Sequence, residues 1–475
     1  MSKMDRIRKN KLFISLMSII AITIIFMIIT FDYVDLNSLT AWAVNFWDAV
    51  FDGRLIHYYE YTTENLRGAH HEVFVGNYLE EIPLALWDIL IYLTHPVSKN
   101  PLVTSTGCLA WARMFYVFMI AVTAVYMNRI CLLFKNAEHN FMKLLILMLG
   151  SAEILISCFY AGQNEIVYIA FFIMALYYFF EKKQAKFLIC SIITISLCPI
   201  MMLPYIILIV AEEKKIWKII VAAIIPMIPT VIFTKIYCHD KLFTGTNDLY
   251  AHKFDKYFMV SSFRSYIDKI PFSILLVIVF LGIFVVYFLI PGVDRLYIEN
   301  RKSEFDEERN IKIIGILAVI MVLWSFLAQD TFYRSFLYLP FLVLYLMIKN
   351  QYHNYECFFL MLLNYSRTYI TLSDNQNMYP GSMLKNGFVA WLMNGRTEGY
   401  ICLYDWLGER EPILGYFGSL FISFTLFLVI IMFTLAYKKK NVQDFYWSEQ
   451  VSLTLYVLTM PVFMMLYYLM LWTIR

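Results

Sequence analysis

Two aspartates, Asp32 and Asp35, follow directly after an apolar stretch that ends at Thr30. If that stretch crosses a membrane, both carboxylates are held at the boundary between the bilayer and water. Partial desolvation makes a carboxylate a stronger proton acceptor, which suits a general base. The alternative is that both acids are solvated and only mark the end of the span. The choice depends on the elements that hold them.

The composition is that of a membrane protein. Of the 475 residues, 60% are hydrophobic and 16% are charged, and the mean hydropathy is +0.63. Soluble domains are about half apolar and a quarter charged. The net charge of +3 is too small to indicate nucleic acid as a partner, and the eight cysteines have no zinc-type spacing. We expect one membrane domain over residues 1–475.

Apolar stretches of bilayer length, roughly 17 to 25 residues, recur along the chain. They predict an all-α polytopic protein of the plasma membrane with about eleven transmembrane helices. The basic N-terminal stretch and the lack of a cleavage site predict a signal anchor with a cytoplasmic N-terminus. Alternation then puts the basic segments 181–186, 212–218, 295–312 and 437–441 in the cytoplasm. The predicted spans are 12–30, 107–130, 141–159, 165–180, 216–237, 271–290, 311–328, 333–348, 355–371, 412–437 and 451–473.

Two apolar segments do not fit simple alternation. Residues 82–94 are too short to span and are expected to lie along the outer interface. Residues 187–210 are interrupted by Pro199 and Pro204 and lie between two basic segments. We therefore expect a short helical hairpin there, which enters the membrane and returns to the cytoplasmic side.

This topology leaves a large first extracytoplasmic loop over residues 31–106. Within it, residues 39–51 place apolar side chains at helical spacing beside Asp48 and Asp52, and Gly53 follows. The pattern predicts an amphipathic interfacial helix that ends at Gly53.

Two stretches resemble the GT-C superfamily of integral-membrane glycosyltransferases, in particular the phosphatidylinositol-glycan mannosyltransferases and their bacterial relatives. The first is the acid after the first span, followed by an amphipathic helix that ends in Gly, then "LIHYYEY" and "NYLEEIPLALWDILIYL". The second is "YAGQNEIVYIAFF" with the basic turn and Pro-containing helices after it. It is similar to the family's Gly-Gln-x-Asp segment, with Glu165 where Asp is usual. The resemblance implies a GT-C-like module over residues 1–220, with 221–475 as the remaining transmembrane module.

The resemblance implies transfer of a hexose, such as mannose, from a polyprenyl-phosphate-linked donor to a glycan, lipid or protein acceptor. The reaction would invert the anomeric configuration on the extracytoplasmic face, with an aspartate as base. Asp35 is the expected base and Asp32 the alternative, because their Asp-x-x-Asp spacing differs from the family's Asp-x-Asp. Together the two acids could also hold a divalent cation, Mg²⁺ or Mn²⁺.

Five further residues are candidates for substrate binding. Arg367 lies inside a predicted span, where an isolated charge is unfavourable, and Arg334 and Arg113 lie near the outer ends of spans. These arginines would neutralise the donor phosphate, unless they form structural ion pairs or reach the interface. Gln163 and Glu165 would face the same outer cavity, unless they only cap the following helix.

Two other functions fit a membrane protein with charges in its spans. A transporter or flippase of a lipid-linked glycan would be expected to have paired halves with matching broken helices, and the sequence has no such symmetry. A polysaccharide polymerase or ligase would more often have a large late loop rich in Arg and His. Residues 372–411 are neither especially basic nor His-containing.

Overall fold

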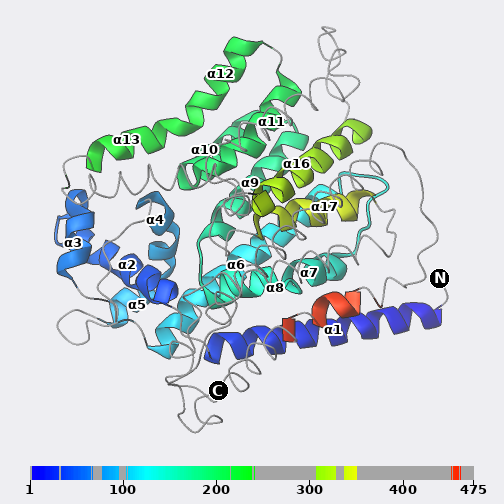
Figure 1. The fold of residues 1–475 in the computed structure, drawn as a ribbon, viewed down its shortest axis with the longest axis horizontal. Coiled ribbons are helices and arrows are strands. Elements are labelled where there is room, and N and C mark those ends of the chain that lie inside the picture. Colours follow the sequence, from blue (N-terminus) through cyan, green and yellow to red (C-terminus); the bar gives the residue numbers. More distant parts are fainter. Residues whose placement is uncertain are drawn as a thin grey trace, which may run out of the picture.

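The structure of the protein is a computed structural model, in which every described element is a helix. The predicted all-α class therefore holds for that part of the chain (Figure 1). The described residues are 3–30, 34–65, 67, 78–95, 103, 105–213, 215–237, 240, 306–327, 336–349, 451, 453–458 and 460–461.

Within these residues, three helices are long and apolar enough to cross a membrane. Several shorter apolar helices accompany them. The predicted boundaries of the spans agree with most of these helices to within a few residues, because apolar length sets both. The three long helices are Asn10–Ile28 within α1 (Lys3–Thr30), α6 (Thr106–Cys131) and Ile216–Tyr237, which comprises α12 (Ile216–Ile224), η4 (Ile225–Met227) and α13 (Ile228–Tyr237). The shorter apolar helices are α9 (Glu165–Phe180), α10 (Gln184–Leu197), α11 (Met202–Glu212) and Phe336–Lys349, which includes α17 (Leu339–Lys349). A further helix, α16 (Glu307–Leu327), has 21 residues. Predicted spans 271–290, 355–371 and 412–437 lie outside the described residues.

The predicted span 141–159 is interrupted. Its first half, α7 (Phe141–Leu149), ends at Gly150, and α8 (Ala152–Ile154) and the π-helical turn η2 (Leu155–Tyr160) follow. A methyl group at Gly150 would lie 3.0 Å from Val457 Cγ2, and the Tyr456 hydroxyl donates to Leu147 O at 2.7 Å. The helix ends at a glycine, which is a common local signal for a helix end, and a distant segment packs against the break.

The Pro-containing segment folds as two helices with a break between them. Cys198 is extended, η3 (Pro199–Met201) follows, and α11 begins next. The Lys182 Nζ lies 2.5 Å from Glu212 Oε1, so the residues before α10 meet the end of α11. The start of α10 and the end of α11 therefore lie close together, as expected of a helical hairpin.

Other chain segments meet near this ion pair. Arg309, at the start of α16, donates to Glu212 Oε1 at 3.0 Å and to Ala211 O at 2.8 Å. The loop after α6 contacts two more helices, because Asn136 N donates to Glu307 Oε1 at 3.3 Å and Glu138 N donates to Met347 O at 2.8 Å. The segments that the sequence assigns to one side of a membrane therefore share one end of the bundle.

The first loop forms four helices at the other end of the bundle, where α1 finishes (Figure 1). The first of them begins earlier than predicted and includes Asp35 in its first turn. It packs against the other three and α6, and of its described side chains only that of Phe51 is exposed. The predicted helix therefore exists and ends before Gly53 as expected, but most of its side chains, that of Asp48 included, are buried. The four are α2 (Val34–Phe51), α3 (Tyr58–Glu64), α4 (Tyr78–Trp87) and α5 (Ile89–Thr94).

Candidate functional site

Asp35 and Gln163, which the sequence assigns to one outer cavity, are in direct contact. The Gln163 Nε2 donates a hydrogen bond of 2.7 Å to Asp35 Oδ2, across 128 positions of sequence. Both side chains are half-buried. Asp35 belongs to the first turn of α2, where unpaired backbone N–H groups stabilise negative charge. The carboxylate is therefore held by an amide and lies at a helix start, which favours its negative charge.

Gly162 explains how Gln163 comes so close to α2. Its φ of +65° is in the left-handed region, which glycine adopts without strain. A methyl group there would lie 2.4 Å from Leu36 Cδ1, so only glycine lets α2 approach this turn. The turn is fixed from behind, because Gln163 N donates to Ser157 O at 2.9 Å.

The same turn is tied to α6 and α4. The buried Tyr116 hydroxyl donates to Gly162 O and lies 3.4 Å from Asn164 Oδ1. Asn164 Nδ2 in turn donates to Glu80 O at 3.3 Å. Asn164 precedes α9 but makes no side-chain cap with it. Gln163 and Asn164 therefore join elements to one another and do not cap the helix that follows.

Buried carboxyl groups surround this arrangement. Glu165 opens α9 and is buried, and Glu81 and Asp88 of the α4–α5 segment are buried as well. Burial raises the pKa of Glu81 and of Asp88 well above the usual range, and neighbouring Glu80 and Asp88 raise that of Glu81 further. Within the described part of the chain, neither oxygen of Asp88 has a hydrogen-bond partner.

The remaining predicted site residues are not all placed by the structure. Arg113 is buried in α6, and its guanidinium donates to Ile28 O at 2.8 Å. It thus binds a carbonyl in the last turn of α1, where helix carbonyls lack partners. Asp32, Arg334 and Arg367 lie outside the described residues. Their predicted roles stay predictions.

The predicted divalent cation has no further candidate ligands in the described ranges. No group of three or more His, Cys, Asp and Glu side chains there could hold a metal ion. Since Asp32 is outside those ranges, the paired-aspartate site stays a prediction.

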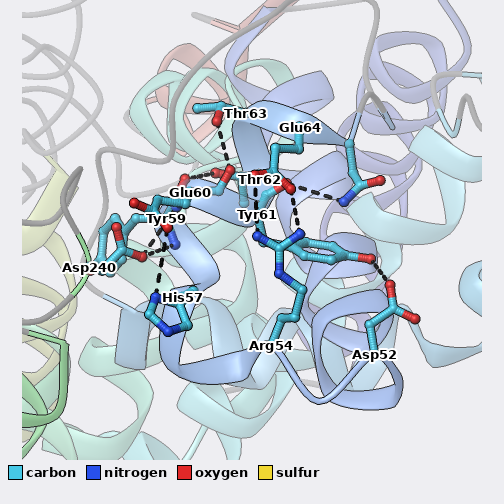
Figure 2. A network of polar contacts seen from close by, with 11 residues as sticks. Asp52, Arg54, His57, Tyr59, Glu60, Tyr61, Thr62, Thr63, Glu64 and Asp240 are labelled. Atoms are coloured by element: carbon cyan, nitrogen blue, oxygen red, sulfur yellow. Dashed lines mark hydrogen bonds and ion pairs between the residues drawn. The ribbon is translucent and has the colours of Figure 1, made fainter.

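A second polar network anchors the first loop (Figure 2). Asp240, which is buried beyond α13, accepts hydrogen bonds from Tyr59 N at 2.9 Å and Glu60 N at 3.2 Å. The Tyr61 hydroxyl donates to Asp52 Oδ2 at 2.5 Å, and both burial and this bond raise the pKa of Tyr61. The network joins α3 to the ends of α2 and α13. Sequence reasoning did not find it, because Asp240 has no local pattern that indicates its partner.

No family model, no curated protein and no solved structure matches this chain. The chemistry of the site is therefore inferred from the half-buried carboxylate, its amide partner and the acids around them.

Proposed function

We propose that the protein is a glycosyltransferase of the membrane with Asp35 as its general base. It transfers a hexose, such as mannose, from a polyprenyl-phosphate-linked donor to a hydroxyl of a glycan, lipid or protein acceptor. The observation that supports this most directly is the 2.7 Å hydrogen bond between Gln163 and Asp35. That bond joins the two sequence segments on which the resemblance to the GT-C superfamily rests.

In the proposed reaction, the acceptor oxygen attacks the anomeric carbon of the donor sugar. The bond from that carbon to the phosphate oxygen breaks, so polyprenyl phosphate leaves as an anion and the configuration inverts. Asp35 takes the proton of the acceptor hydroxyl. Gln163 holds one carboxylate oxygen and thereby directs the base. Contacts of this kind are stronger in a half-buried site than in bulk water.

We propose the extracytoplasmic face of the plasma membrane for this site, in a chain that crosses about eleven times. Alternation from a cytoplasmic N-terminus assigns the turns near Asn136, Lys182, Glu212 and Glu307 to one side and Asp35 to the other. The ion pairs and hydrogen bonds that join those four turns support this assignment. So does the contact of Asp35 with the turn before α9.

The donor's phosphate requires cations. Arg334 and Arg367 are the proposed ligands, since an arginine fork binds two phosphate oxygens at once. Asp32 could join Asp35 in holding a divalent cation that bridges to the phosphate. For Arg113 the structure supports a structural role, because its guanidinium binds the end of α1.

The test is donor turnover by purified protein in lipid nanodiscs, with a panel of polyprenyl-phosphate sugars. We expect one donor to be consumed, and Asp35→Asn to slow its transfer at least about a hundredfold while donor binding persists. Asp52→Asn is the matched control. Asp52 lies just beyond the other end of α2, where it accepts a hydrogen bond from the Tyr61 hydroxyl. It should keep most of the activity.

Two results would contradict the proposal. If Asp35→Asn keeps full turnover in a folded protein, Asp35 is not the base. If no donor in the panel turns over but vesicles containing the protein move a lipid-linked glycan across the bilayer, the protein is a carrier.

A further inference from the structure

A thiol and an imidazole meet at the start of α6. Cys108 Sγ lies 3.7 Å from His95 Nε2. The other ring nitrogen, Nδ1, lies 2.9 Å from Thr94 Oγ1 and 3.3 Å from Ile91 O. Since the Thr94 hydroxyl donates its own hydrogen to backbone carbonyls, it accepts from Nδ1. This leaves Nε2 as the acceptor that faces the thiol.

The sulfur also has a donor and a helix start beside it. Ser105 is the N-cap of α6, and its hydroxyl oxygen accepts from Cys108 N at 3.3 Å. The same hydroxyl lies 3.1 Å from Cys108 Sγ, to which it donates. Negative charge that develops on the sulfur is therefore stabilised by a hydroxyl and by the first turn of a 26-residue helix.

A buried ion pair fixes the backbone of His95. Arg67 donates to both carboxylate oxygens of Asp48, at 2.7 and 2.8 Å, and is almost fully buried. Its third contact is the carbonyl of His95, at 2.6 Å. The backbone carbonyl of Arg67 accepts a hydrogen bond of 2.8 Å from Val103 N. The pair thus connects α2, the end of α5 and the approach to α6.

The Cys108 thiol is buried directly after three exposed residues. Cys108 itself is 5% exposed and contacts an apolar cluster that includes Ala41 and Val44 of α2. The three residues before it, from Ser105 to Gly107, are exposed. A methyl group added to Gly107 would meet no atom within 4 Å, so the described residues leave space beside the first turn of α6.

We propose that Cys108 and His95 form a reactive pair that is modified by low-molecular-weight disulfides. The Cys108 sulfur attacks one sulfur of the disulfide, and its proton passes to His95 Nε2. The disulfide's S–S bond breaks as the new S–S bond forms. The departing sulfur takes the proton from His95 and leaves as a thiol, so no further oxidant is required. The product is a mixed disulfide on Cys108, wedged beside α2.

Oxidised glutathione is the probe, added to the folded, reduced protein in detergent, with each cysteine followed by peptide mass. We expect Cys108 to gain the glutathionyl group about tenfold faster than in His95→Gln, which cannot act as a base. Cys131 and Cys158, both fully buried, are controls within the same molecule and should stay unmodified. Should His95→Gln fail to fold, Ser105→Ala removes the hydroxyl donor and should also slow the reaction.

The pH dependence separates the pair from an ordinary thiol. An unassisted thiol reacts only as thiolate, whose amount rises about tenfold per pH unit below about pH 8.5. We expect His95→Gln to follow that slope between pH 7 and 8 and the wild-type rate to change less. Equal rates and slopes in the two proteins would overturn the proposal. So would a folded protein whose Cys108 stays unmodified until urea unfolds it.

Discussion

At the scale of single residues, the carboxylate of Asp35 has a neutral partner that is distant in sequence. The Gln163 amide donates to Asp35 Oδ2, and Gly162 brings the amide there by adopting a positive φ. Tyr116 and Asn164 then tie the turn to α6 and α4. A turn 128 residues away therefore contributes to the orientation of the proposed base.

Gln163→Leu should show how much that orientation contributes. The change keeps the size of the side chain but removes the donor, and a hydrogen bond to a charged group contributes about 1.5–3 kcal/mol. We expect sugar transfer to slow by at least about tenfold, with donor affinity little changed. Turnover and donor binding are measured on the same preparation. A variant that loses donor affinity and keeps its turnover number would instead make Gln163 a substrate ligand.

The buried acids predict an unusual pH dependence of stability. Burial raises the pKa of Asp88, so its carboxyl takes up a proton on folding when the pH lies between its unfolded pKa of about 3.9 and its folded pKa. Its contribution is therefore most favourable below that value, and stability falls as the pH rises toward the folded pKa. Asp88→Asn cannot titrate. We expect it to melt at a higher temperature than wild type at pH 8, with the difference shrinking toward pH 4.

Thermal unfolding in detergent between pH 4 and 8 measures this effect. The control is Glu64→Gln, because Glu64 is exposed and its pKa is lowered by hydrogen bonding to Arg54. That variant should melt at most slightly below wild type at pH 8. If Asp88→Asn melts at a lower temperature than wild type at pH 8, Asp88 is charged and paired in the folded protein.

At the scale of helices, close contact between α2 and the turn before α9 is the arrangement most sensitive to substitution. Gly162→Ala adds a methyl group 2.4 Å from Leu36 Cδ1 and forces alanine to a φ of +65°. The backbone strain alone costs about 1–2 kcal/mol. We expect a lower melting temperature and slower sugar transfer. Asp35 is next to Leu36 in α2, so a shift of Leu36 also displaces the carboxylate.

Gly107→Ala is the matched control for that variant. Gly107 lies inside α6, and a methyl group there meets nothing within 4 Å. Alanine is also favoured over glycine in a helix by about 1 kcal/mol, so this variant should be as stable as wild type or more so. If both alanine variants behave alike, the contact between Gly162 and Leu36 does not constrain α2.

Helices whose boundaries follow from their own residues could be predicted from the sequence. The predicted span 165–180 has the bounds of α9, and 216–237 those of α12 to α13, because apolar length decides both. The break at Gly150 was not predicted, although a glycine followed by a serine is a local signal for a helix end; the contact with Val457, far along the chain, could not be predicted. The predicted helix 39–51 began too late, because α2 begins at Val34. An acid such as Asp35 in front of the helix resembles a solvated linker in the sequence, and its contact with the turn at Gly162 could not be foreseen.

The candidate site was predictable only in part. Asp35 and Gln163 could be paired through the resemblance, and their contact agrees with that expectation. Tyr116, Glu81 and Asp88 were missed, since an acid or a tyrosine in an apolar stretch is equally typical of an interface. The Cys108 and His95 pair carries one weak local signal, a serine three residues before the cysteine at a helix start.

At the scale of the whole molecule, the contacts between loops predict which residues share a side of the membrane. Lys182 binds Glu212, and Arg309 binds the same carboxylate, so all three regions lie at one end of the bundle. The exposed face of α3 lies at the other. We expect a cysteine at Gln184 to be protected from an impermeant maleimide in intact cells and a cysteine at Thr63 to be labelled.

Permeabilised cells provide the control, because both positions are exposed and should then react alike. Labelling of position 184 from outside would contradict the proposed topology. It would also remove the argument that Asp35 faces the extracytoplasmic side.

The contact between Tyr456 and Leu147 can form only late in biosynthesis. Its two residues are 309 positions apart. At about 5–20 residues per second, the ribosome therefore needs roughly 15 to 60 seconds to supply the tyrosine after the leucine has been made. During that interval the break at Gly150 lacks the side chains that later cover it. A nascent chain that stops before Val457 should therefore be degraded faster than the full-length protein.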